Sequence, residues 1–134
     1  MKMNPGGAPL PGLVELIRSD VHAKAEWLYG DSSSASVTKA WLTDGTLAMV
    51  VYRLMQACQR KRLAPLSMFF NKVNVALGCI IGRGADFGPG FVLIHSQGVV
   101  INSSVRGGRN VKLEHQVTIG AERNQSPVLG DDIF

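Results

Sequence analysis

Two histidines in the second half of the chain could act as bases at neutral pH. His95 lies in the segment Leu93-Ile-His95-Ser-Gln-Gly-Val-Val-Ile101, and His115 lies further along the same region. Histidine can take a proton near neutral pH without a large pKa shift, so it can activate an alcohol for attack on an acyl group. His95 is therefore the candidate general base. The competing interpretation is a histidine that is hydrogen-bonded in an ordinary turn.

The region around His95 repeats every six residues. After Gly78, the repeat starts first at Ile81, Phe87 and Leu93. A two-residue slip follows segment 94–98, and the repeat then starts at Ile101, Gly107, Leu113 and Ile119. Such short repeats are typical of a solenoid in which each unit forms one face of a triangular coil and three units form a turn. The pattern predicts about three coils between Ile81 and Phe134. It also places His95 at the slip, where a side chain can point outward toward a cleft.

Glycines and one polar loop mark the repeat further. A glycine follows many of the repeat-start positions, where a crowded turn would favour a residue without a Cβ atom; these glycines are Gly82, Gly88, Gly108, Gly120 and Gly130. A polar loop from Glu122 to Val128 interrupts the pattern before it resumes at Leu129. Loops inserted into a solenoid usually lie on one functional face.

The residues before Gly78 have a helical period instead. Apolar residues at steps of three and four predict a helix from about Leu13 that ends at Gly30, and a short segment follows around Val37 to Trp41. Asp44 is expected to cap a helix from Thr46 to about Arg62, and Pro65 to start a last helix that ends near Gly78. The residues expected to face inward on the first of these helices are Leu47, Val50, Val51, Leu54, Met55 and Cys58. Those expected to face inward on the last helix are Leu66, Phe69, Phe70 and Val73.

Charge and hydropathy argue against several partners. The net charge is +4, but the basic residues are scattered apart from the cluster 60–62, and no aromatic platform accompanies them, so nucleic acid is not an expected partner. The longest apolar run, Leu47 to Leu54, contains Arg53 and falls well short of the roughly 20 residues that span a bilayer. No membrane association is expected.

The N-terminus and the cysteines favour a cytoplasmic protein. Met1 to Pro11 lacks the apolar run and the cleavage site of a signal peptide. Cys58 and Cys79 form too small a set for a disulfide framework, so reduced thiols are expected.

Several of these segments resemble the hexapeptide-repeat acyltransferases, and within them the serine acetyltransferase type. The family pattern I-G-x-G is matched by Ile81-Gly-Arg-Gly, its histidine segment by Leu93 to Ile101, and its G-V-T-I-G motif by Gln116-Val-Thr-Ile-Gly120. The helical part agrees as well, at Leu16-Ile-Arg-Ser-Asp20 and at Tyr52-Arg53. The resemblance covers roughly residues 14 to 134.

The resemblance implies a fold, an activity and a set of site residues. The fold is α+β: a helical N-terminal domain, 1–78, followed by a left-handed parallel β-helix, 79–134, apparently truncated because family members continue through further coils. The activity is O-acetylation of L-serine to O-acetylserine in cysteine biosynthesis, with acetyl-CoA as co-substrate and neither a permanently bound cofactor nor a metal. His95 would be the catalytic base, His115 a possible second histidine, and Gly120 and Ala121 would contact the coenzyme. The implied assembly is a homotrimer.

The chain departs from the family pattern at the acceptor site. The carboxylates that bind serine and orient the histidine in the family fall at Ile80 and Ile94, so a backbone carbonyl is expected to orient His95 instead. Asp31 could match the carboxylate that the helical domain contributes. Gln125 and Ser126 stand where the family has an Arg-His pair for the acceptor's carboxylate. These three residues are the predicted substrate-binding set, and the acceptor stays open between serine and a sugar hydroxyl.

Two other classes of function remain open. One is a non-catalytic assembly protein in which the solenoid is only a trimerisation surface. The other is a metal-dependent enzyme on the same solenoid, like the carbonic anhydrases of this architecture, which needs three converging histidines where the repeats hold only His95 and His115.

Overall fold

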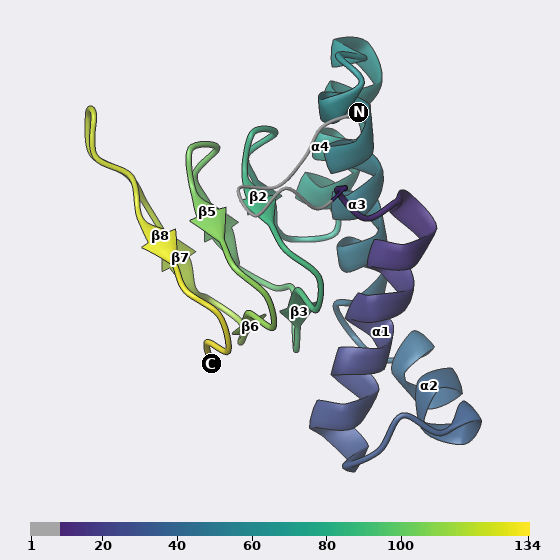
Figure 1. Ribbon diagram of the computed structural model, residues 1–134. Coiled ribbons are helices and arrows are strands. Elements are labelled where there is room, and N and C mark those ends of the chain that lie inside the picture. The colour runs from purple at the N-terminus through teal and green to yellow at the C-terminus, as the bar shows by residue number, and fades with distance from the viewer. Residues whose placement is uncertain (1–8) are drawn as a thin grey trace.

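The computed structural model describes residues 9–134, which form four helices followed by eight two-residue strands (Figure 1). Residues 1–8, which include most of the N-terminal segment considered for a signal peptide, lie outside the described residues. The helices are α1 (Leu13–Tyr29), α2 (Ser34–Trp41), α3 (Thr46–Arg60) and α4 (Ala64–Ala76). The strands are β1 (Ile80–Ile81), β2 (Asp86–Phe87), β3 (Val92–Leu93), β4 (Val100–Ile101), β5 (Arg106–Gly107), β6 (Lys112–Leu113), β7 (Thr118–Ile119) and β8 (Val128–Leu129).

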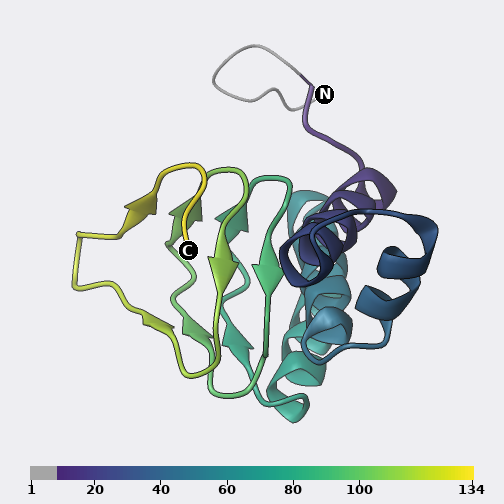
Figure 2. The ribbon, with the colours of Figure 1, turned by 90° about the horizontal axis from the view of Figure 1, so that it is seen from below.

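The strands wind into a triangular solenoid of parallel sheets. One face is β1-β4-β7, the second is β2-β5-β8 and the third is β3-β6, extended by a bridge between Val111 and Ile133. Equivalent repeat positions lie directly above one another, as in the column Ile81, Ile101 and Ile119. The prediction of about three coils of a left-handed parallel β-helix is confirmed. Figure 2 shows the helices at one end of the coils and the loop between β7 and β8 at the other.

Stacking of the coils explains the small residues in the repeat. The ring of Phe87 fills the interior, and a Cβ atom on Gly107 in the next coil would clash with it. The crowding expected at Gly82, Gly88 and Gly108 is also confirmed, since a Cβ atom there would collide with the backbone of the coil above. For Gly120 and Gly130, which lie in the last described coil, no described atom lies within 4 Å of a Cβ atom built there, and the expectation stays a prediction.

The helices and the coils share one hydrophobic core. Ala48, Met49, Tyr52 and Met55 of α3 pack in the same buried cluster as Ile81 and the other inward residues of the first two coils. The last helix ends at Ala76 and the first strand begins at Ile80, on either side of the boundary predicted at Gly78. The division into two domains at that point stays a prediction.

One detail predicted for α3 is wrong. The helix ends at Arg60, close to the predicted end at about Arg62, but its N-cap is Gly45, with no side-chain cap. Gly45 has a φ of 81°, so the chain turns sharply just before the helix and the Asp44 side chain is not used as a cap.

The predicted inward stripes of α3 and α4 are also partly wrong. Leu47 is 62% exposed and Phe69 59% exposed, and Leu66 is exposed too. The contact between the two helices uses small polar side chains instead: Ser67 donates to the Gln59 side chain at 3.0 Å and Asn74 to the Ala48 carbonyl at 3.3 Å. Because short side chains that bring their own hydrogen bonds can face a neighbouring helix, counting apolar residues misplaced the contact face.

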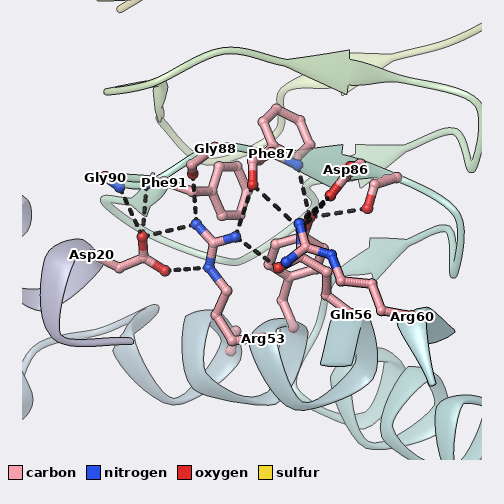
Figure 3. Close-up of polar contacts among 12 residues, drawn as sticks. Asp20, Arg53, Gln56, Arg60, Asp86, Phe87, Gly88, Gly90 and Phe91 are labelled. Carbon is pink, nitrogen blue, oxygen red and sulfur yellow. Dashed lines mark hydrogen bonds and ion pairs between the residues drawn. The ribbon is translucent and has the colours of Figure 1, made fainter. Parts of the chain in front are cut away.

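A buried ion pair joins the helices to the first coil (Figure 3). Arg53 of α3 and Asp20 of α1 are both about 1% exposed, and the Arg53 Nε and Nη2 atoms donate to the two Asp20 carboxylate oxygens at 2.6 and 2.9 Å. The same guanidinium donates to the carbonyl oxygens of Phe87 at 2.9 Å and Gly88 at 2.7 Å. Asp20 in turn accepts the backbone N–H groups of Gly90 and Phe91. The segment between β2 and β3 is therefore bound to two helices at once.

A second set of hydrogen bonds surrounds this ion pair. The Tyr52 hydroxyl donates to the Ala85 carbonyl at 2.9 Å and accepts the Phe87 N–H at 3.1 Å. Burial raises the pKa of Tyr52 far above its ordinary value, so it remains the neutral donor that this geometry requires. Gln56 and Arg60 both contact the carboxylate of Asp86, as Figure 3 shows.

The start of α3 lies against the end of β3. A Cβ atom added to Gly45 would lie 2.6 Å from the Leu93 carbonyl oxygen, closer than real Cβ contacts. Only glycine fits this approach, and it brings the turn between α2 and α3 directly beside the residues that follow β3. Within residues 9–134, no helix combines the length and the apolar character that crossing a bilayer requires.

Removing the arginine of the buried pair should destabilise the protein far more than removing an exposed one. Arg53→Met leaves the buried Asp20 carboxylate without its cation, so we expect a loss of about 3–5 kcal/mol in the free energy of unfolding. The control is Arg60→Gln, because Arg60 and its partner Asp86 are partly exposed; it should cost less than about 1 kcal/mol. Urea unfolding at equal protein concentration measures both, and equal losses would contradict the assigned role of Arg53.

The close approach at Gly45 can be tested with a matched glycine. Gly30 has a similar φ of 79° but no atom within 4 Å of an added Cβ. Gly30→Ala should therefore cost only the strain of the left-handed backbone, about 1 kcal/mol. Gly45→Ala should cost about 1–3 kcal/mol more, because the Leu93 backbone must move. Thermal or urea unfolding of the two variants checks the difference, and indistinguishable losses would show that α3 does not press on β3.

Candidate active site

His95 lies in the corner where the repeat is two residues longer. The chain needs eight positions from β3 to β4, where the other corners before β7 need six, and the additional residues form the turn at 94–99. Ile94 is buried, whereas the His95 side chain is 50% exposed. The expected outward position of His95 at the slip is confirmed.

His95 opens into a cleft between the helices and the coils. The cleft has a volume of about 370 Å³ and is lined by Asp44, Gly45, His95, Ser96, Gln97 and His115. The first two residues come from the turn before α3, the next three from the first coil and the last from the second coil. The site therefore exists only because the helices pack against the solenoid.

Asp44 faces the imidazole of His95. One carboxylate oxygen of Asp44 lies 3.4 Å from Nδ1 of His95. A carboxylate on this side favours the tautomer with the proton on Nδ1, which leaves Nε2 free to accept a proton. The sequence predicts that a backbone carbonyl orients the ring. In the structure an acidic side chain from the helical part lies in that place. The sequence pattern predicts Asp44 as a helix cap, and its position beside His95 corrects that prediction.

His115 is the second histidine of the cleft. It follows β6, and its ring lies 6.0 Å from that of His95, edge to face. Its Nδ1 atom lies 3.8 Å from a carboxylate oxygen of the neighbouring Glu114. Both histidines are about half exposed, which makes them a matched pair for comparison.

The other predicted site residues lie elsewhere. Gly120, Ala121, Gln125 and Ser126 line one open cavity of about 560 Å³ along the loop between β7 and β8. None of them lines the cleft of His95 within this single chain. The four residues predicted to bind coenzyme or acceptor are thus brought together, but apart from the candidate base.

Asp31 has a local structural partner. Its carboxylate accepts the backbone N–H of Ser33 just before α2. Hydrogen bonds from the Ser33 and Ser36 side chains, with that backbone bond, lower the pKa of Asp31 to about 2. It lines neither the His95 cleft nor the loop cavity. Among residues 9–134, no cluster of three or more histidine, cysteine or acidic side chains could hold a metal ion.

Known proteins similar in sequence are serine acetyltransferases. The chain is 30% identical to the chloroplastic serine acetyltransferase 1 of Arabidopsis thaliana over 131 residues. This alignment covers 92% of this chain and 40% of that protein. It is 29% identical to the serine acetyltransferase of Helicobacter pylori over 97 residues, 69% of this chain and 57% of that one. The chain thus spans about half the length of these relatives or less. No protein-family model matches it.

Solved structures agree on the fold. The crystal structure of Neisseria gonorrhoeae serine acetyltransferase superposes with a TM-score of 0.76 at 21% identity, over 89% of this chain and 49% of that one. Isoform 3 from Entamoeba histolytica, solved with cysteine, gives a TM-score of 0.68 at 21% identity, over 89% and 44% of the two chains. In sequence and in fold, the chain is therefore serine acetyltransferase-like over the part of those proteins that it spans.

Proposed function

We propose that this protein transfers an acetyl group from acetyl-CoA to a hydroxyl group, with His95 as the general base. The observation that carries the proposal is the cleft in which Nδ1 of His95 faces the Asp44 carboxylate. This arrangement leaves Nε2 of the same ring as a free acceptor in a cavity large enough for a small alcohol. Neutral imidazole with a fixed tautomer is the group that general-base catalysis at neutral pH requires.

The proposed reaction runs through two proton transfers at Nε2. As the acceptor hydroxyl attacks the thioester carbonyl, Nε2 takes its proton and the Asp44 carboxylate stabilises the imidazolium that forms. In the homotrimer proposed below, a backbone N–H group from the Gly120 region of a neighbouring subunit stabilises the oxyanion of the tetrahedral intermediate. The intermediate then collapses, the C–S bond breaks, and Nε2 returns the proton to the leaving thiolate of coenzyme A. The products are the acetyl ester and free coenzyme A.

L-Serine is the acceptor that we propose first, because the relatives at about 30% identity are serine acetyltransferases. A sugar hydroxyl is the second candidate, and one observation favours it. No arginine or lysine is among the described residues that line the His95 cleft. A serine carboxylate would therefore lack a cationic partner there, and burying a charge without a partner is costly.

We also propose that Gly120 and Ala121 contact acetyl-CoA and that Gln125 and Ser126 contact the acceptor. Their shared cavity supports a common role, but it does not adjoin His95 in a single chain. The homotrimer that the family resemblance implies would bring such surfaces together between neighbouring subunits. Asp31 lines neither cavity, so its role in acceptor binding stays a prediction from the sequence. A cytoplasmic location also remains a prediction.

The assembly can be tested directly. Sedimentation of the full product of the gene at micromolar concentration should give the mass of a trimer. A folded monomer at that concentration would contradict both the trimer and a site shared between subunits.

The catalytic role can be tested by comparing the two histidines. His95→Ala should lower the rate of thiol release from acetyl-CoA by roughly 10² to 10⁴, as expected for loss of a general base. His115→Ala removes an equally exposed ring from the same cleft and should have a much smaller effect. The assay uses the full product of the gene, with serine and sugar acceptors offered side by side.

The same assay separates the alternatives. If His115→Ala abolishes turnover while His95→Ala leaves it unchanged, the base has been assigned to the wrong histidine. If no acceptor is acetylated by the unmodified protein, the non-catalytic assembly role is correct.

A further inference from the structure

A buried lysine lies beneath the candidate site. Lys24 of α1 is fully buried, and its ammonium donates hydrogen bonds to the Asp44 carbonyl and, at 3.1 Å, to the Thr46 hydroxyl. Neither acceptor carries a charge. Lysine is rarely buried without a carboxylate partner, because removing its charge from water is costly. A residue that costs stability in this way is a candidate for a functional role.

Lys24 holds the turn that carries Asp44. The Thr46 hydroxyl that receives the Lys24 bond donates in turn to the Ala40 carbonyl at 2.7 Å, so one ammonium group links α1 to the end of α2 and the start of α3. The Asp44 side chain itself is 83% exposed, and His95 is its ion-pair partner among the described residues. Its direction therefore depends on how firmly its backbone is held.

Resting on the function proposed above, we propose that Lys24 is a positioning residue. Its ammonium fixes the Asp44 backbone from inside the protein, so that the exposed carboxylate stays beside Nδ1 of His95. Gly45 limits the turn from the other side through its contact with Leu93. Lys24 itself does not line the cleft, so it acts on His95 only through Asp44.

The charge of Lys24 makes this support dependent on pH. Burial lowers the pKa of Lys24 from 10.5 to about 8, and the nearby Asp44 carboxylate opposes that shift. The other groups around it contribute little charge: α3 provides the Thr46 hydroxyl, α2 the Ala40 carbonyl, and Asp20 on α1 is paired with Arg53. The coils contribute His95 and His115 across the cleft. As the pH rises through about 8, the ammonium becomes an amine and its bond to Asp44 weakens.

Lys24→Met tests the inference without requiring catalysis. Nuclear magnetic resonance of the imidazole nitrogens in the full product of the gene reports which nitrogen of His95 carries the proton, measured just below pH 8. The unmodified protein and the control Lys39→Met, which removes an exposed lysine of α2, should keep the proton on Nδ1. Lys24→Met should shift it largely to Nε2. Lys24→Gln, whose amide is a stronger neutral donor than an amine, should restore most of the Nδ1 tautomer.

The pH dependence gives a second readout. In a His115→Gln background, the Nδ1–H population of His95 should fall as the pH rises through about 8, and this step should be absent in Lys24→Gln. Stability should respond in the opposite direction. Between about pH 8 and 10.5 unfolded Lys24 binds a proton that folded Lys24 has lost, so the unmodified protein gains stability relative to Lys24→Met as the pH rises. At neutral pH the melting temperature of Lys24→Met should be no lower than that of the unmodified protein.

Asp44→Asn distinguishes the possible failures. If Asp44→Asn moves the proton from Nδ1 and Lys24→Met does not, the positioning role of Lys24 is overturned and the proposed site stands. If neither variant moves it, both the role of Lys24 and the orientation of His95 by Asp44 are overturned. Because the tautomer is read directly, a lack of acetyl transfer to any acceptor would not affect this result.

Discussion

The rest of the structure depends on the buried pair of Asp20 and Arg53. Each nitrogen of the Arg53 guanidinium donates a hydrogen bond: to Asp20 on α1, to Gln56 on α3, and to the carbonyls of Phe87 and Gly88 in the first coil. A guanidinium suits this position because its donors are rigid, planar and always charged. Burying two charges is favourable only when all their hydrogen-bonding groups are satisfied. This requirement fixes how α1 and α3 lie on the segment between β2 and β3.

The candidate site follows from that fixed arrangement. The segment held by Asp20 and Arg53 leads directly into β3, whose last residue, Leu93, contacts Gly45 at the start of α3. The long corner after β3 and the turn before α3 are therefore adjacent, and they present His95 and Asp44 to each other. Since Asp44 and His95 are both largely exposed, their attraction alone would be worth less than about 1 kcal/mol. The buried contacts, and not this pair, determine the geometry of the cleft.

The sequence could predict what depends on local patterns. The period of six, its slip before Val100, the exposed His95 and the ends of most helices follow from spacing and from glycine positions within short segments. It could not predict contacts between distant segments. Asp44 precedes a helix and looks like a cap, and only the φ of Gly45 and the docking on Leu93 aim it at His95. Lys24 was a signal of such a contact in the sequence. It is a lysine on the apolar face of α1, beside Val21 and Ala25, and a charged residue on that face indicates a buried polar contact with another segment.

Amide hydrogen exchange at Gly90 and Phe91 tests the central role of the buried pair most directly. Both amides donate to Asp20, so in the unmodified protein they should exchange only through unfolding that also opens the ends of α1 and α3. Asp20→Asn should speed their exchange, together with that of the turn at Asp44, while the amides of the second coil stay protected. Exchange at Gly90, Phe91 and the turn that is unchanged by Asp20→Asn would contradict the account, because the helices would then be held on the coils by something other than this pair.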